Sequence, residues 1–410
     1  MTFAQLPRER LRGVLVPVSM IADRAGFGGT ALGDCLAGDL VIAGDRALGL
    51  EPASAEPRRL VMPKLTEPHV HLDKCHTIDR IAASGGDLAA AIEAQAADRQ
   101  NWGEDDLRAR IRRGLTEAVE AGCGTLRSHV DWGSATPPEE TPLAWPILGE
   151  MAREMPAGFT LQRAALTGID RMADAAYAAT CAGLIAEGGG VLGAFVFDQP
   201  ERREGLVNTF REAERLGLAL DFHVDEGLDP GLDGLEMIAD VALAHGHQGP
   251  VLCGHGCSLS IRDAETRKRV AGKLARAGIA LAVLPSTNLY LQGRKADARG
   301  LAPAKELMAE GVNVVLGADN VRDAFCPVGR HDPLQTLALG VLAAHLDPPF
   351  ARHLPMITTG ARKALGLPPQ TVDGAGTGDL LLFDACSVSE LLSGGCRPLA
   401  LAEALQGEPR

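Results

Sequence analysis

From Leu60 onward, short apolar runs alternate with longer segments whose apolar residues recur at helical spacing. The short runs are almost continuously hydrophobic, which is typical of strands buried on both faces of a parallel sheet. The pattern predicts strands near Leu60–Leu65, Gly124–Asp131, Phe159–Leu166, Gly190–Phe197, Leu218–Glu226, Pro250–Gly256, Ile279–Pro285 and Asn313–Asn320. It predicts helices over Asp105–Ala121, Arg202–Leu216, Gly234–His245, Asp263–Ala277 and Ala302–Glu310.

Strands that alternate in this way with helices are typical of the α/β class, and in particular of a (β/α)8 TIM barrel. An open doubly wound sheet is the main alternative, but no GxGxxG motif follows an early strand. Polar residues follow the first, fifth, sixth and eighth predicted strands, and only a closed barrel places the first strand beside the eighth. We therefore expect a TIM barrel.

The two ends of the chain have a different pattern. Residues 1–59 and 366–410 contain short apolar pieces, such as DLVIAG and DLLLFD, separated by Gly, Pro and Asp. We expect these ends to form one small β-sandwich domain, with the barrel over residues 60–365. The chain has 410 residues, which exceeds the ~250 of a simple barrel and leaves room for such a domain.

Composition narrows the class of protein and of partner. The formal net charge of −13 argues against binding of nucleic acid or of an anionic membrane surface. The chain has no apolar stretch of the ~18 residues that a membrane span needs. Its 9 cysteines form no CxxC pair, so we expect no disulfide framework and a cytoplasmic location. A small molecule is the expected partner, and a homo-oligomer is possible.

Histidines and acidic residues stand where the predicted strands end. His69 and His71 are one residue apart, so on a strand both rings point the same way and can reach one metal ion. In a TIM barrel, functional side chains lie at the C-terminal ends of the strands. Those ends carry His69, His71, His129, Asp131, His223, Glu226, His255 and Asp319.

Imidazoles combined with a carboxylate suit a divalent ion such as Zn²⁺ or Fe²⁺, which would activate a water molecule for attack. Asp319 could accept a proton from that water, and Glu226 could carry one to the leaving group. His129 and Asp131 fit two roles, support of the metal ligands or a structural link between strands. The remaining histidines of helices and loops are expected to be surface or packing residues, namely His245, His247, His331, His345 and His353.

Five segments of the chain, PHVHLDK, DFHVDE, CGHG, NLYLQGR and LGADNVRDAFCPVG, resemble the cytosine deaminase branch of the amidohydrolase superfamily. The resemblance covers residues 60–370 and implies a barrel with a β-sandwich domain. It implies a mononuclear metal held by His69, His71, His223 and Asp319. It also implies that Glu226 is the proton shuttle and that His255 hydrogen-bonds the metal-bound water.

The fourth predicted strand, VLGAFVFDQ, contains no Lys. Dinuclear members of the superfamily generally bridge their two metals with a carboxylated Lys at the end of that strand. We therefore expect one divalent metal ion per subunit.

Three positions bear on the substrate. Gly168 and Asn320 stand where cytosine-specific members of the family carry a Gln and a second Asp. An amide both donates and accepts hydrogen bonds, whereas an ionised carboxylate only accepts them, so the ring edge that is read should differ. Lys74 resembles relatives that act on amino-substituted triazines, such as N-isopropylammelide isopropylamidohydrolase. We expect Lys74, Gly168 and Asn320 to belong to the substrate site.

The sequence thus predicts a metal-dependent hydrolytic deaminase of a small amino-substituted nitrogen heterocycle, which releases ammonia. Cytosine or a 5-substituted cytosine such as 5-methylcytosine is the first expectation, and amino-triazines and isocytosine-type rings are alternatives. A cyclic amide hydrolase of the hydantoinase or dihydroorotase kind is a further alternative, but such enzymes usually need the bridging Lys. A non-catalytic barrel is disfavoured because every metal ligand is present.

Overall fold

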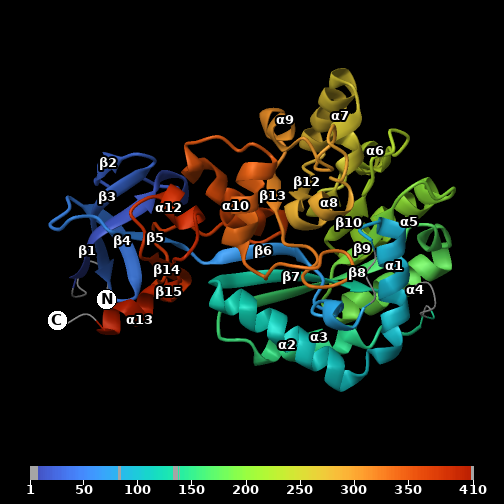
Figure 1. The fold of residues 1–410 in the computed structure, drawn as a ribbon, viewed down its shortest axis with the longest axis horizontal. Helices are drawn as coiled ribbons and strands as arrows, with labels where there is room; N and C mark the ends of the chain where they lie inside the picture. The colour runs from blue at the N-terminus through green and yellow to red at the C-terminus, as the bar shows by residue number, and fades with distance from the viewer. Residues whose placement is uncertain (1–7, 82–84, 133–136, 138, 408–410) are drawn as a thin grey trace.

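Eight parallel strands form the centre of the protein (Figure 1). The computed structural model describes residues 8–81, 85–132, 137 and 139–407. In order around the sheet the strands are β6 (Leu65–Val70), β7 (Cys123–Asp131), β8 (Thr160–Gly168), β9 (Leu192–Val196), β10 (Leu220–Val224), β11 (Val251–His255), β12 (Ala280–Val283) and β13 (Val314–Leu316). A parallel bridge between Val70 and Asp319 joins the first strand to the last. The predicted TIM barrel is confirmed.

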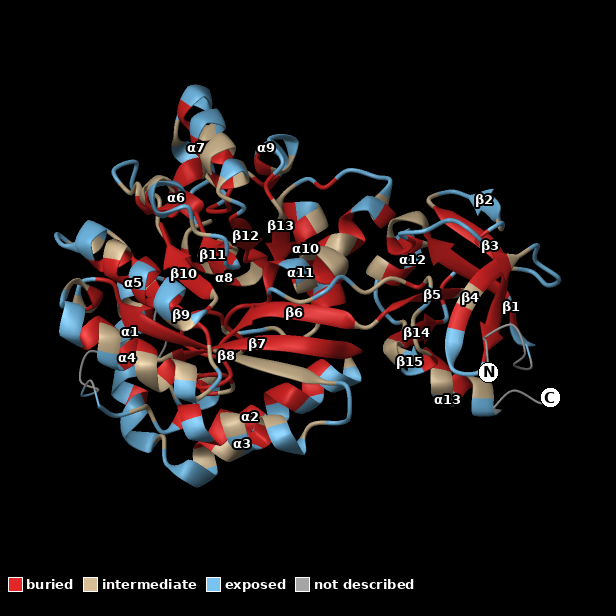
Figure 2. Ribbon diagram, turned by 180° about the vertical axis from the view of Figure 1, so that it is seen from behind, coloured by how far each residue is buried: buried red, intermediate tan, exposed pale blue. Residues whose placement is uncertain are grey.

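Helices surround these strands, with exposed outer faces and buried faces toward the sheet (Figure 2). Two of them, α5 (Arg202–Leu216) and α6 (Gly234–His245), have the predicted bounds. No helix in the described part of the chain is long and apolar enough to cross a membrane. The other helices of the barrel are α1 (Leu88–Asp98), α2 (Glu104–Glu120), α3 (Ala144–Glu154), α4 (Ala175–Glu187), α7 (Ala264–Arg276), α8 (Pro285–Leu291), α9 (Ala304–Ala309), α10 (Pro333–Ala343) and α11 (Thr359–Ala364).

The small domain lies at one side of the barrel and joins both ends of the chain, as predicted (Figure 1). Its sheet has the order β15-β14-β5-β1-β3-β2, and β4 pairs with β3. The antiparallel pairing of β5 with β14 connects the N-terminal and C-terminal segments. Its strands and helices are β1 (Arg8–Pro17), β2 (Thr30–Leu32), β3 (Cys35–Ala43), β4 (Arg46–Glu51), β5 (Arg59–Pro63), β14 (Leu380–Phe383), β15 (Leu399–Ala400), α12 (Val388–Leu392) and α13 (Leu401–Gly407).

The prediction of a single first barrel strand over Leu60–Leu65 is wrong. The structure divides this apolar stretch between β5 of the small sheet and β6 of the barrel. The break falls at Lys64, whose N–H donates to Asp379 O at 2.9 Å instead of joining either ladder. A continuous apolar run does not reveal a change of sheet, because both strands are buried. The division into residues 1–59 plus 366–410 and 60–365 stays a prediction.

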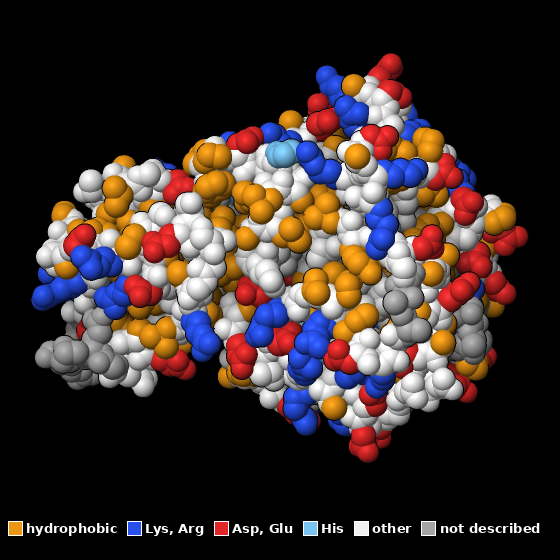
Figure 3. All heavy atoms as spheres, in the orientation of Figure 1, with side chains coloured by type: hydrophobic (Ala, Val, Ile, Leu, Met, Phe, Trp, Pro, Cys, Tyr) orange, Lys and Arg blue, Asp and Glu red, His pale blue; other side chains and the backbone are white. Residues whose placement is uncertain are grey.

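The barrel interior is polar below the site. Arg127 Nη1 lies 2.8 Å from Asp221 Oδ2, and Arg127 Nη2 lies 2.7 Å from Gln162 Oε1. The Arg127 side chain is only 1% exposed and that of Asp221 is 0% exposed. Each buried charge therefore needs the other as its partner. On the outer surface, by contrast, acidic and basic side chains are interspersed over the face drawn in Figure 3.

Helix α5 approaches the loop after β8 so closely that only glycine fits at position 205. A Cβ atom built there would overlap the carbonyl oxygen of Ile169, which is backbone and cannot turn away. Gly205→Ala should therefore destabilise the protein by about 1–3 kcal/mol through overpacking, although alanine is the better helix former. The midpoint of urea unfolding measures this change.

Gly183→Ala on α4 is the matched control, because nothing lies within 4 Å of a Cβ atom at that helical position. We expect it to raise the unfolding free energy by about 0.5–1 kcal/mol. Equal effects of the two substitutions would contradict the close approach of α5.

Candidate metal centre and substrate cavity

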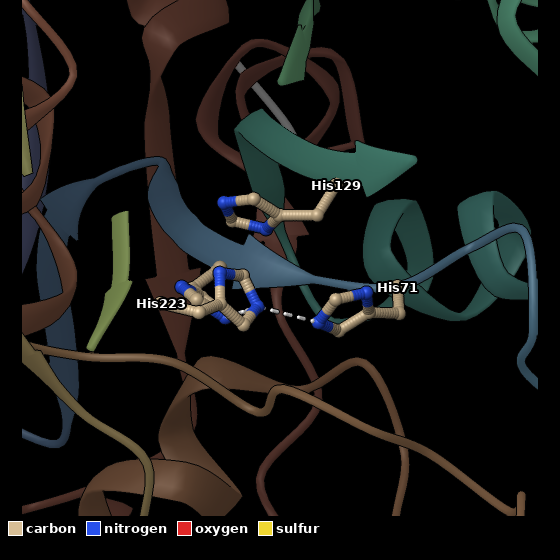
Figure 4. Close-up of side chains that lie close together, drawn as sticks. His71, His129 and His223 are labelled. Atoms are coloured by element: carbon tan, nitrogen blue, oxygen red, sulfur yellow. Dashed lines mark hydrogen bonds between the residues drawn. The ribbon is translucent and has the colours of Figure 1, made fainter. Parts of the chain in front are cut away.

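Four of the predicted side chains converge at the mouth of the barrel. The Nε2 atoms of His69 and His71 lie 3.2 and 3.0 Å from His223 Nε2. The same two atoms lie 3.4 and 3.2 Å from Asp319 Oδ1. Figure 4 shows His71 and His223 pointing toward each other, with His129 beside them. All four side chains are buried.

The donor set fits a divalent metal ion. Donors about 2.1 Å from a tetrahedral ion stand roughly 3.4 Å apart, which is close to the spacing of these atoms. Burial lowers the pKa of His71 to about 3 and holds the pKa of His223 well below 6.5. Both rings are therefore neutral at pH 7 and keep a lone pair for a metal. The site is a histidine-rich potential metal site.

Asp319 completes this set. Apart from the facing histidines, neither of its buried carboxylate oxygens has a partner among the described residues. Burial opposes its ionisation, but His69 and His71 outweigh that effect and hold the pKa of Asp319 well below 3.8. Buried charges in proteins are paired or coordinate metals, so this carboxylate is suited to binding a cation.

Barrel closure places Asp319 beside the two histidines of the first strand. Its N–H donates to His69 O at 2.8 Å, so the backbone of β6 holds the residue after β13 directly. Asp319 has a φ of 59°, a left-handed conformation that non-glycine residues rarely adopt. In this conformation the chain turns away from the strand direction, so that the Asp319 carboxylate faces the histidines.

Glu226 and His255 lie next to these four side chains. His255 Nε2 lies 3.6 Å from Glu226 Oε2, and Asn288 Nδ2 donates to His255 Nδ1 at 3.0 Å. That bond leaves the proton of the neutral ring on Nε2, which faces the site. Burial, followed by the charge of Asp319, raises the pKa of Glu226 well above 4.5. A shift in this direction favours the protonated carboxyl group, the form that can donate to a ligand.

The structure places His129 and Asp131 in different surroundings. The His129 ring lies against His69 with centroids 4.0 Å apart, and its Nε2 lies 3.0 Å from Asp221 Oδ1. This arrangement fits support of a metal ligand. Asp131 instead lies in the cavity wall, where its carboxylate is 2.9 Å from Lys74 Nζ and 2.7 Å from Arg99 Nη2.

A cavity of about 330 Å³ opens beside the histidines. This volume is at the lower end of the range for small-molecule sites, which favours a small ligand. Its walls combine flat aromatic rings with charged and amide groups. The cavity is lined by His71, Lys74, Leu88, Ile92, Gln95, Ala96, Arg99, Asp131, Leu166, Phe195, Phe197, His223, Glu226, His255, Asp319, Asn320 and Phe325.

Two of the three predicted substrate residues line this cavity. Lys74 Nζ lies 5.0 Å from the centre of the Phe325 ring, as well as next to Asp131. Asn320 Nδ2 donates to Asp323 Oδ2 at 2.6 Å, which leaves its carbonyl oxygen and its second N–H for a ligand. Gly168 ends β8 and is outside the lining.

The Phe195 ring occupies the wall position beside Gly168. Its Cζ atom would lie 3.3 Å from a Cβ atom at residue 168. A contact between Gly168 and a substrate stays a prediction.

Sequence reasoning did not identify several residues of the site. Asp221 stands two residues before His223, so the strand period of two already places both on one side of β10. Phe195 lies on β9, where no residue had been predicted for the site and the strand period therefore gave no starting point. Arg99 carries no such signal, because it is not on a strand. It directly follows α1, a helix between the first two barrel strands that was not predicted from the sequence.

Comparison with known proteins places the chain in a family. Residues 104–373 match the amidohydrolase family. A pterin deaminase of Rhizobium rhizogenes is 33% identical over 383 residues, which cover 90% of this chain and 87% of that protein.

Two solved structures are similar in fold. The 5-methylcytosine deaminase of Klebsiella pneumoniae has a TM-score of 0.77 at 22% identity and covers 96% of each chain. N-isopropylammelide isopropylaminohydrolase of Burkholderia multivorans has a TM-score of 0.71 at 22% identity, over 93% of this chain and 94% of that one. These two structures support the fold, while the match over residues 104–373 and the relative that is 33% identical show that the chain belongs to the amidohydrolase family.

Proposed function

We propose that this protein is a metal-dependent hydrolytic deaminase whose substrate is a bicyclic 2-amino-4-oxo heterocycle of the pterin class. The reaction replaces the ring amino group with oxygen and releases ammonia. The observation that carries the proposal is the convergence of His69, His71, His223 and Asp319 beside Glu226, whose pKa burial raises, at the end of a cavity with aromatic walls.

We assign the metal to His69, His71, His223 and Asp319, with Zn²⁺ or Fe²⁺ as the ion, because imidazole and carboxylate donors suit both. When bound, such an ion supplies Lewis acidity that makes water a stronger nucleophile at neutral pH. The remaining steps belong to residues of this chain.

Glu226 donates its proton to the ring nitrogen beside the carbon that carries the amino group. That carbon becomes more electrophilic, and the water oxygen attacks it. Asp319 accepts a proton from the attacking water, and the Nε2–H of His255 donates a hydrogen bond to the incoming oxygen. Asp319 then passes its proton to the amino group, which leaves as ammonia. The remaining hydroxyl proton returns to Glu226 as the ring carbonyl forms, so both residues are reset and one water molecule is consumed for each ammonia released.

The pterin class is supported by two observations. The relative named as a pterin deaminase aligns with 90% of this chain at 33% identity. The cavity beside the metal ligands includes Phe195, Phe197 and Phe325, whose rings suit the faces of a flat heterocycle. We infer that Lys74 donates a hydrogen bond to the ring oxygen, because Asp131 and Asp73 outweigh burial and keep the pKa of Lys74 above 10.5.

The proposal selects one of the alternatives from the sequence. Pterin contains the isocytosine ring, in which the amino group is on the carbon between two ring nitrogens. Cytosine, the first expectation, carries its amino group on a different ring carbon and has no second ring. Asn320 offers an acceptor oxygen, and an acceptor suits the N–H groups of the isocytosine edge.

Ammonia release measured with a substrate panel tests the proposal. We expect kcat/KM for pterin to exceed that for isocytosine, cytosine, 5-methylcytosine and an amino-triazine by roughly 10-fold or more, or ~1.4 kcal/mol of transition-state stabilisation. Preference for cytosine or 5-methylcytosine by the same factor would reject the pterin assignment. Turnover of hydantoin or dihydroorotate alone would reject deamination.

Glu226→Gln should lower kcat by about 100-fold or more, because an amide cannot transfer the proton that Glu226 supplies. Metal content should not change, since Glu226 is not assigned as a ligand. Steady-state kinetics together with elemental analysis measures both quantities. Glu214→Gln, at an exposed position of α5, is the control and should leave both unchanged. A loss of metal in Glu226→Gln would mean that its role has been misassigned.

A further inference from the structure

A second group of metal-ligand side chains lies outside the barrel mouth. It consists of His76, in the turn after β6, Glu117, near the end of α2, and His331, in the segment before α10. One donor atom from each residue lies within 4.8 Å of the others. Glu117 Oε2 is 3.1 Å from His331 Nδ1 and 3.7 Å from His76 Nε2. We call these three residues the His76 cluster.

The His76 cluster is buried and its donors are not satisfied. The side chains of His331, His76 and Glu117 are 0%, 3% and 10% exposed. Both ring nitrogens of His76, and Nε2 of His331, have no hydrogen-bond partner among the described residues. Buried polar atoms without partners are costly, by ~1–3 kcal/mol each. The surface or packing role expected for His331 from the sequence does not explain why these buried polar atoms are left without partners.

The charges in the cluster fit ligation rather than simple ion pairing. Burial lowers the pKa of His76 to about 4, so its ring is neutral and has a lone pair. The carboxylate of Glu117 stays ionised, because His331 and His76 outweigh burial and lower its pKa to about 2. Arg113 Nε lies 3.6 Å from Glu117 Oε1, which leaves Oε2 toward the histidines.

Helix α2 leaves space for the His331 ring. Gly114 is in the interior of this helix, where glycine costs ~1 kcal/mol relative to alanine. A Cβ atom there would lie 3.0 Å from His331 Cε1 and 2.6 Å from a methyl carbon of Leu72. The glycine therefore allows His331 to lie against the helix, one turn before Glu117.

We propose that His76, Glu117 and His331 form a second metal site that binds Zn²⁺ and is separate from the barrel-mouth ligands. Two imidazoles and one carboxylate are a known zinc donor set, and a water molecule would supply the fourth position. This ion is additional to the single active-site ion expected from the sequence.

The second ion would hold a wall of the substrate cavity. His76 follows Lys74 by two residues, and its N–H donates to Val321 O at 3.1 Å. The turn that carries Lys74 would thus be connected through the ion to α2 and to the segment before α10. None of the three ligands lines the cavity, so the expected role of this ion is structural.

Zinc stoichiometry of the full-length protein tests the proposal. The protein is stripped of metal, reconstituted with Zn²⁺ alone, desalted and measured by elemental analysis. We expect two Zn²⁺ per chain in the wild type, and one in His331→Gln, in Glu117→Gln and in His223→Ala. The double variant His223→Ala/Glu117→Gln should bind none. His345→Gln, at an exposed histidine, is the matched control and should still bind two.

Two outcomes would overturn the proposal, namely a single Zn²⁺ in the wild type, or two in both His331→Gln and Glu117→Gln. Circular dichroism identifies a variant that fails to fold. In that case Co²⁺ is added to His223→Ala, where the second site alone remains. Visible absorption of tetrahedral Co²⁺ supports the site, and its absence rejects it.

Discussion

Closure of the barrel between β6 and β13 is the constraint on which the site depends. The closing contact consists of a bridge that joins Val70 to Asp319 and a hydrogen bond that the Asp319 N–H donates to His69 O. One backbone contact therefore completes the sheet and places Asp319, in the segment after the last strand, beside the histidines of the first. If the sheet were open at this edge, His69 and Asp319 would be at opposite ends of eight strands, and no metal could reach both.

The polar barrel interior supports this closure from below. Glu67 accepts hydrogen bonds from the N–H groups of His69 and Ala318, so it connects the same two strands a second time. Burial raises the pKa of Glu67 to about 8, which keeps its side chain largely neutral at pH 7. On the other side, Asp221 contacts both Arg127 and His129. Metal-ligating histidines in proteins are commonly oriented by such neighbouring groups. Here the neighbouring groups are buried, and Arg127 and Asp221 carry opposite charges.

Local patterns allowed much of this structure to be predicted, and long-range contacts account for the rest. Helix bounds at α5 and α6 follow from the amphipathic period, and the strand period of two places His69 and His71 together. The change of sheet at Lys64 could not be predicted from the sequence, because buried strands are equally apolar in both sheets. Phe195 beside Gly168, and Arg99 beside Asp131, depend on packing between segments that are distant in the sequence. The sequence signals the histidines and the aspartate that converge at the barrel mouth, but not the shape of the cavity beside them.

The two histidine clusters show how surroundings assign a role to similar donors. Both combine buried imidazoles with a carboxylate whose pKa is lowered by the neighbouring histidines, so both have the donors that a divalent ion needs. The barrel-mouth cluster also borders a cavity and has a proton donor, Glu226, within reach of the same space. The His76 cluster has Arg113 against its carboxylate and borders no part of that cavity. A bound ion can activate water for attack only where a substrate can approach it, so we propose chemistry for the barrel-mouth cluster and a structural role for the His76 cluster.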